Sequence, residues 1–309
     1  MSTIRPAVIS RRSLLLAGAV GLPAAVALTT RAGGQEERYT VAELAGVIAT
    51  TRSEPLFVGL AHLILQPGAH TEAVNTAGPR IIALTSGRLI VGTAGAGTFF
   101  RNPDNDPTGF PQPAPPPHPV APGEAVVLEP GDRVALEPGA VREIRNDGPT
   151  PAVYLDAALF PPGPDPVPAA FTTVDGISFQ LLVGATLDPV PAGALQFALS
   201  RAEVSPDGAW PAVARDGPAV VYVESGSLAL IPTAGAVRFS RAAAPTAYSL
   251  PAPLRDVPLG TTVRLTAGAA ALLPTGSAVD ARNERRVPAR LLLVEVRTLP
   301  AGPATPAAR

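Results

Sequence analysis

The side chains that most often carry out chemistry in proteins are scarce in this chain. It contains three histidines and no cysteine among its 309 residues. The lack of cysteine excludes disulfides, thiolate catalysis and thiolate metal sites. The histidines lie in an apolar stretch (His62), a polar loop (His70) and a proline-rich segment (His118), which argues against a serine–histidine–aspartate triad. His70 and Glu72 are close in sequence, but a metal bound by nitrogen and oxygen usually has three or four ligands.

Familiar catalytic and binding motifs are absent from the sequence as well. It contains no Gly-x-Ser-x-Gly, no His-Glu-x-x-His, no phosphate-binding glycine-rich loop and no aspartate-rich calcium loop. All 24 basic residues are arginine, and 25 acidic residues bring the net charge to −1. This balance offers no electrostatic attraction to nucleic acid or to an anionic membrane, so neither is expected as a partner.

The elements that must position any functional side chain are short strands. Apolar residues make up 46% of the chain, which is enough to build the cores of two domains. The 29 glycines and 38 prolines disfavour helices and suit many strands joined by turns. The sequence therefore predicts an all-β protein.

The chain repeats one plan twice: a strand, a loop, a strand, a tight glycine turn and further strands. The matched landmarks are Gly131 with Gly268, Gly139 with Gly276, Asn146 with Asn283, and Gly87 with Gly226. The first three pairs are 137 residues apart and the fourth is 139 residues apart. Agreement of four landmarks within two residues indicates an internal duplication.

The order of Gly268, Pro274, Gly276 and Asn283 resembles the second sequence motif of the cupin superfamily, whose members are small β-barrels of the jelly-roll kind. The resemblance implies two tandem cupin (jelly-roll) β-barrels, a bicupin. A proline-rich stretch over 161–168 reads as a stiff extended linker between them. The expected organisation is a targeting segment over 1–31, a first barrel over 32–164, a second barrel over 165–298 and a disordered tail over 299–309.

The resemblance also locates the positions at which metal-binding cupins carry histidine and glutamate. Counted from the matched glycines, Arg80 and Ala219 stand at the glutamate positions, and Arg142 and Val279 stand at the second-motif histidine positions. The paired-histidine positions of the first motif hold Val74 and Thr76 or Ala73 and Asn75 in the first copy, and Val213 and Arg215 or Ala212 and Ala214 in the second. The resemblance therefore implies barrels without the usual metal ligands, and no metal or other cofactor is expected.

The same count implies that Arg80, Arg142 and Arg215 face the barrel interiors. A buried guanidinium needs an anionic partner, because an unpaired buried charge is very unfavourable. On one interpretation Arg80 and Arg142 bind a small carboxylate-bearing molecule through the planar guanidinium fork. On the other, the arginines reach out of the barrel mouth or form internal pairs, for which the candidates are Glu72, Glu137 and Glu143.

Tyr222 is a further candidate for contacting a ligand, because it lies with Trp210 near the first motif of the second copy. An aromatic residue at such a place is more often part of a core. The leading hypothesis is an exported bicupin that acts as a small-molecule-binding or structural module. The two barrels are expected to pack against each other within the chain, and a homodimer is a candidate assembly. The alternative is a cupin enzyme, either a metal-independent isomerase or lyase or a dioxygenase with atypical ligands.

The N-terminus resembles a twin-arginine export signal. Arg11 and Arg12 precede an uncharged apolar run over 14–27, and Ala25-Val26-Ala27 has the small-x-small pattern of a cleavage site. The run is shorter than the ~20 residues that span a bilayer comfortably. We therefore expect export to the periplasm or the medium, the alternatives being an uncleaved amphipathic helix or a short membrane anchor.

Overall fold

The computed structural model describes the chain between residues 39 and 299, with gaps. The described residues are 39–51, 55–71, 74–75, 78–105, 115–162, 175–187, 190, 193–210, 214–242, 248–249 and 252–299. The predicted export signal, most of the predicted linker and all but the first residue of the predicted tail lie outside these ranges.

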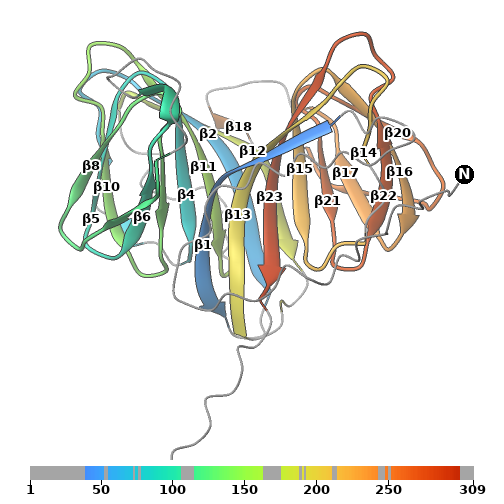
Figure 1. Ribbon diagram of the computed structural model, residues 1–309, viewed down its shortest axis with the longest axis horizontal. Helices are drawn as coiled ribbons and strands as arrows, with labels where there is room; N and C mark the ends of the chain where they lie inside the picture. Colours follow the sequence, from blue (N-terminus) through green and yellow to red (C-terminus); the bar gives the residue numbers. More distant parts are fainter. Residues whose placement is uncertain are drawn as a thin grey trace, which may run out of the picture.

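The first barrel consists of an eight-stranded and a four-stranded sheet (Figure 1). In spatial order, the larger sheet contains β18 (Tyr248–Ser249), β12 (Ile177–Leu187), β2 (Leu56–Leu65), β11 (Ala152–Phe160), β4 (Arg80–Ser86), β9 (Arg133–Leu136), β6 (Gly97–Phe100) and β7 (His118–Val120). The smaller sheet contains β3 (Val74–Asn75), β10 (Val141–Arg145), β5 (Leu89–Thr93) and β8 (Ala125–Leu128). A 3-10 turn, η1 (Pro103–Asn105), follows β6.

The second barrel has the same plan, with a seven-stranded and a four-stranded sheet. The larger sheet contains β1 (Tyr39–Thr51), β13 (Gly193–Val204), β23 (Ala289–Thr298), β15 (Ala219–Ser225), β21 (Ala270–Leu273), β17 (Val237–Ser240) and β19 (Arg255–Val257). The smaller sheet contains β14 (Ala209–Trp210), β22 (Ala278–Arg282), β16 (Ser227–Ala234) and β20 (Val263–Thr266). The prediction of an all-β chain with two jelly-roll barrels is confirmed.

The described ranges contain no helix long and apolar enough to cross a membrane.

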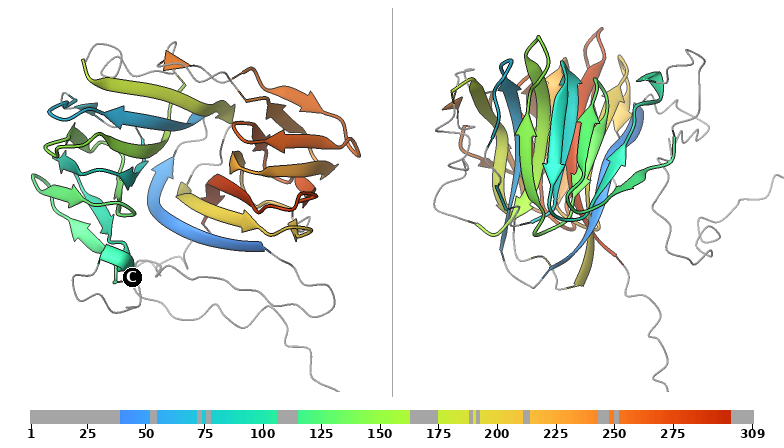
Figure 2. Two further views of the ribbon diagram at one scale, coloured as in Figure 1. Left: turned by 90° about the horizontal axis from the view of Figure 1, so that it is seen from above. Right: turned by 90° about the vertical axis from the view of Figure 1, so that its left-hand side faces the viewer.

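The two barrels exchange their first strands. β1 pairs antiparallel with β13, from Tyr39 opposite Val204 to Thr51 opposite Gly193. In the opposite direction, β12 pairs with β2 of the first barrel. Figure 2 shows β1 curving alongside β13. The second barrel therefore contains β1 from the first half of the sequence, and the first barrel contains β12 and the short β18 from the second half, a feature that the predicted ranges 32–164 and 165–298 did not include.

Most strands of the larger sheets are buried on both faces. On β4, Ile82 and Leu84 pack inside the first barrel, whereas Ile81 and Ala83 pack between the barrels. Successive side chains of a strand point to opposite faces, so such a strand needs apolar residues at every position. This is why the sequence reads as continuous apolar runs rather than as alternation.

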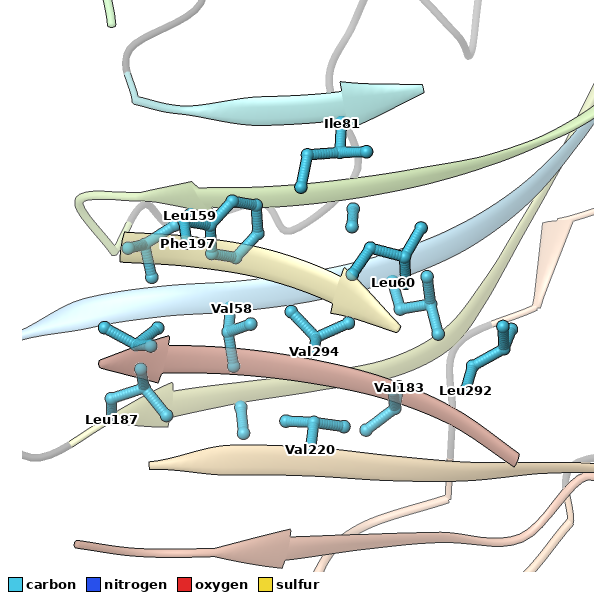
Figure 3. Packing of buried hydrophobic residues seen from close by; sticks show 14 of the residues in the cluster. Val58, Leu60, Ile81, Leu159, Val183, Leu187, Phe197, Val220, Leu292 and Val294 are labelled. Atoms are coloured by element: carbon cyan, nitrogen blue, oxygen red, sulfur yellow. The ribbon is translucent and has the colours of Figure 1, made fainter. Parts of the chain in front are cut away.

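The largest apolar cluster lies between the barrels, where the two larger sheets pack face to face. Figure 3 shows side chains from both sheets meeting there. The residues that it labels are Val58, Leu60, Ile81, Leu159, Val183 and Leu187 of the first barrel's sheet, and Phe197, Val220, Leu292 and Val294 of the second barrel's sheet. Separate clusters fill each barrel. Because burial of apolar area is the main stabilising contribution to folding, the two barrels form one unit.

Candidate ligand-binding site

The asparagine at the end of the motif, Asn146, makes three side-chain hydrogen bonds to the backbone of the first barrel. Asn146 is completely buried. Its amide nitrogen donates to the carbonyl oxygens of Leu65 and Thr150, each at 2.9 Å, and its side-chain oxygen accepts from the backbone N–H of Gly148 at 2.9 Å. A side chain without this pair of donors and this acceptor would leave buried backbone groups unsatisfied.

Asn283 makes the same three hydrogen bonds in the second barrel. It is also completely buried. It donates to the carbonyl oxygens of Val204 at 2.9 Å and Val287 at 2.7 Å, and accepts from the backbone N–H of Arg285 at 3.0 Å. The repeat seen in the sequence is therefore also a repeat of hydrogen bonding. In both barrels the motif asparagine bonds the corresponding backbone groups.

The interior of the first barrel contains a buried ion pair. Arg80 on β4 lies on the same face as Ile82, and Asp156 on β11 lies on the same face as Tyr154, both of which belong to that barrel's core. The Nε atom of Arg80 is 3.3 Å from Oδ1 of Asp156, and the two side chains are only 10% and 4% exposed. As the sequence predicted, Arg80 points inward.

The partner of Arg80 differs from the candidates named from the sequence. Glu137 and Glu143 are exposed, and Glu72 lies outside the described residues. The carboxylate comes instead from Asp156, which pairs in register with Ile82 and Ala61 of the neighbouring strands. The internal pair that the sequence left open as an alternative is therefore present, with an aspartate on the strand that follows the motif.

The corresponding positions of the second barrel are apolar. At the offsets of the duplication, Ala219 replaces Arg80 and Leu293 replaces Asp156. Both are almost fully buried in the core of the second barrel, together with Val279 at the second-motif histidine position. In the second barrel, apolar side chains therefore fill these three positions.

Arg215 lies nearer the edge of the second barrel and is also paired. Its Nη1 donates to Oε1 of Glu295 at 3.0 Å, and its guanidinium stacks 5.2 Å from the ring centroid of Trp210. Glu295 also accepts from Arg297, which lies 4.0 Å from Glu43 on the exchanged strand β1. Burial lowers the pKa of Arg215, an effect that the carboxylate of Glu295 partly offsets. These successive ionic contacts connect the exchanged strand β1 to β23 of the second barrel.

The other two candidates from the sequence, Arg142 and Tyr222, are not part of these ion pairs in the described structure. The backbone of Arg142 lies on β10 opposite Val74 and Thr93, and its side chain lies outside what the structure describes. Tyr222 alternates with residues of the second barrel's core but itself packs against the cluster between the barrels. Tyr222 therefore lies on the opposite face of its strand from the interior of the second barrel.

Asp156 is the residue of this region that the sequence reasoning missed. A signal was present: it is the single charged residue in the otherwise apolar or aromatic strand Ala152–Phe160. The duplication offset would have aligned it with Leu293, which marks it as a polar residue at an interior position.

No group of three or more histidine, cysteine, aspartate or glutamate side chains suited to a metal ion occurs among the residues that the structure describes. The metal-free character of the barrels stays a prediction from the sequence.

Solved structures similar to this one belong to proteins of different kinds. The oxalate decarboxylase of Lactobacillus farciminis, solved with formate, is 13% identical over 91% of this chain and 87% of that chain, with a TM-score of 0.43. A cupin 2 conserved barrel domain protein from Leptotrichia buccalis is 12% identical over 82% and 90%, with a TM-score of 0.35. The coconut allergen cocosin is 13% identical over 84% and 85%, with a TM-score of 0.41.

No protein-family model and no curated protein matches the sequence. The fold is established by the strand order of the two barrels and by their repeated buried asparagines. By this architecture, the chain has the fold of a bicupin, two jelly-roll barrels in tandem that exchange their first strands.

Proposed function

We propose that this protein is an exported, metal-independent bicupin that binds a small carboxylate-bearing molecule in its first barrel. The observation that carries the proposal is the buried pair of Arg80 and Asp156, at positions where the second barrel has Ala219 and Leu293. Replacing a buried ion pair by apolar residues of suitable size is often neutral or stabilising. Since the second barrel packs well with the apolar solution, a role beyond stability accounts for the pair in the first.

The chemistry of arginine suits this role. Its guanidinium has five N–H donors in a planar fork, and Asp156 faces Nε in the described ion pair. In the proposed complex the ligand carboxylate accepts from the terminal nitrogens of Arg80. Asp156 already balances the charge of Arg80, so the negative charge of the ligand requires a second cation. Arg142, at the second-motif position of the same barrel, is the proposed source.

The second barrel supports the first in this proposal. Its counterparts of Arg80 and Asp156, Ala219 and Leu293, are apolar, and its larger sheet receives β1 from the first half of the chain. Its contribution is to hold the larger sheet of the first barrel through the shared apolar cluster. The ligand-binding role thus belongs to one barrel and the structural role to the other.

The proposal is tested by isothermal titration calorimetry of the mature chain with a panel of small carboxylates, such as benzoate, malonate and succinate. Arg142→Met should abolish binding of the carboxylate that the wild type binds. Arg145→Met is the matched control, because Arg145 lies on the same strand, is 46% exposed and pairs with Asp147. Equal binding by the two variants would contradict the role of Arg142.

Export is tested separately. Changing both Arg11 and Arg12 to lysine should keep the protein in the cytoplasm, because a twin-arginine signal depends on the arginine pair. Fractionation of cells that express each form measures this. An unchanged periplasmic or extracellular fraction would remove the twin-arginine route from the proposal and leave the binding part intact.

A further inference from the structure

A group of polar side chains lies at one end of the interface between the barrels. These residues sit on the strand faces that build the interface cluster, two or four positions beyond a residue that belongs to it. On β9, Arg133 precedes Ala135, and on β13, Arg201 follows Leu199. The remaining members are Tyr222 and Glu224, which follow Val220 on β15, and His62, which follows Leu60 on β2. We call these five residues the polar seam.

Strand register places the seam residues at one level of the molecule. In the first barrel's sheet, Arg133, Ala83, Leu155 and His62 pair in succession across four neighbouring strands. In the second barrel's sheet, a corresponding row runs from Arg201 through Leu292 to Tyr222. Each row therefore has polar side chains at its ends and apolar ones between them.

The two rows face each other. β1, which pairs with β13, lies against β9, and β12, which pairs with β2, lies against β15. Arg133 and Arg201 are therefore at one side of the seam, and His62 and Tyr222 are at the other. Between them, Leu155 is 4% exposed and Leu292 is 1% exposed, so these apolar side chains are covered, whereas Tyr222 is half-buried.

The polar seam has more positively than negatively charged side chains. Arg201 binds Glu224 through two hydrogen bonds, Nε to Oε2 at 2.8 Å and Nη2 to Oε1 at 2.9 Å. Arg133 donates from Nη1 to the backbone carbonyl of Leu44 at 3.2 Å. Asp132, the carboxylate next to Arg133, accepts hydrogen bonds from two backbone N–H groups and is completely buried. The seam therefore holds two guanidinium groups and one carboxylate.

These groups are partly removed from water. Burial lowers the pKa of Arg133, which the charge of Asp132 opposes and that of Arg201 reinforces. Burial also lowers the pKa of His62, and it raises the pKa of Tyr222 together with the nearby charge of Glu224. Hydrogen bonds between charged groups are stronger where water is partly excluded.

We infer that the polar seam is a second binding site, for a small organic anion with an apolar or aromatic body. The anionic group lies between Arg133 and Arg201, and the body lies against the half-buried ring of Tyr222. This site is separate from the one proposed inside the first barrel, because Arg80 and Asp156 lie on the opposite face of the same sheet.

The probe for this site is anilinonaphthalene sulfonate (ANS), an aromatic anion whose fluorescence rises in apolar surroundings. We expect saturable binding of one ANS per chain. Arg133→Gln should weaken it about tenfold, the effect of one lost charge-assisted hydrogen bond. Arg133→Lys should weaken it less, because the charge is kept. A salt titration should weaken binding to the wild type.

Two controls separate this site from others. Arg264→Gln removes an arginine that is 40% exposed and paired with Glu284 on the smaller sheet of the second barrel, so ANS should bind unchanged. The double variant Arg80→Ala with Asp156→Leu alters only the first barrel's interior and should also bind ANS unchanged. Circular dichroism and cooperative thermal unfolding of each variant exclude ANS binding to misfolded protein.

Unsaturable ANS binding, or equal affinity in Arg133→Gln and Arg264→Gln, would overturn the inference. Loss of ANS binding in the first-barrel variant with retention in Arg133→Gln would also overturn it, and would place the anion inside the first barrel. Because the probe is a sulfonate and the variants differ, failure here is distinguishable from failure of the carboxylate-binding proposal.

Discussion

Arg80 and Asp156 face each other across two neighbouring strands inside the first barrel, and the second barrel has Ala219 and Leu293 at the same two positions. The duplication thus supplies an internal reference for the pair. The second barrel fills these positions with apolar side chains. In the first barrel, burying two charges costs desolvation free energy and side-chain conformational entropy. The predictions below start from this difference.

The ion pair should show a strongly non-additive stability pattern. Asp156→Leu alone leaves a buried guanidinium without its carboxylate and should lower the free energy of unfolding by about 3–5 kcal/mol. Combining it with Arg80→Ala reproduces the residues of the second barrel and should restore stability to within about 1 kcal/mol of the wild type or raise it. Urea unfolding of the two single variants and the double variant measures this cycle. Additive losses would show that the two charges are not energetically coupled and would contradict the prediction.

The two motif asparagines should be equally important. Asn146→Ala and Asn283→Ala each leave one buried carbonyl, one partly buried carbonyl and one backbone N–H without their partner. We expect each to cost on the order of 3 kcal/mol, since an unsatisfied buried group costs about 1–3 kcal/mol. Chemical denaturation is the measurement. A loss at one site and none at the other would contradict the structural equivalence of the barrels.

Gly217 should not tolerate a side chain. A Cβ there would overlap the backbone carbonyl of Val296, and the equivalent Gly78 meets Leu159 in the same way. Gly217→Ala should therefore prevent stable folding or lower the melting temperature steeply. Gly92→Ala is the matched control, because its nearest neighbour would be Cβ of Glu143 at an ordinary 3.9 Å. Similar melting temperatures for the two variants would disprove the close approach.

His62 should make the fold sensitive to acid. Burial lowers the pKa of His62 below its ordinary value of 6.5, so the unfolded chain binds a proton more readily than the folded one. Stability should therefore fall as the pH drops below about 6.5, and this contribution should level off below the folded-state pKa. Urea unfolding between pH 5 and pH 8 should show a smaller fall for His62→Gln. Parallel curves for the wild type and the variant would refute this contribution.

Much of the fold could be predicted from the sequence. The glycines, proline and asparagine of the motif impose backbone conformations and buried hydrogen bonds that few other residues satisfy, as the positive φ angles of Gly131 and Gly268 show. The exchange of β1 and β12 could not be predicted, because the alternation of buried and more exposed residues along these strands does not specify which sheet they join. Their partners are selected by the chain connection and by packing across the interface.

The candidate sites were less predictable than the fold. Counting from Gly87 correctly placed Arg80 inside the barrel, because register along a strand fixes the face of each residue. Its partner, Asp156, is distant in sequence and becomes visible only when β11 lies beside β4. Tyr222 was a candidate for contacting a ligand, with a core position as the commoner alternative; it is one residue out of phase with Val221 and Val223 and packs against the cluster between the barrels.

The most direct test of the central claim is a calorimetric titration of the wild type and of the double variant Arg80→Ala with Asp156→Leu, using the same panel of small carboxylates. The variant gives the first barrel the interior residues of the second and is expected to fold. We predict that the wild type binds one carboxylate per chain and that the double variant, with an unchanged melting temperature, binds none. Equal binding by both proteins would contradict a ligand-binding role for the ion pair.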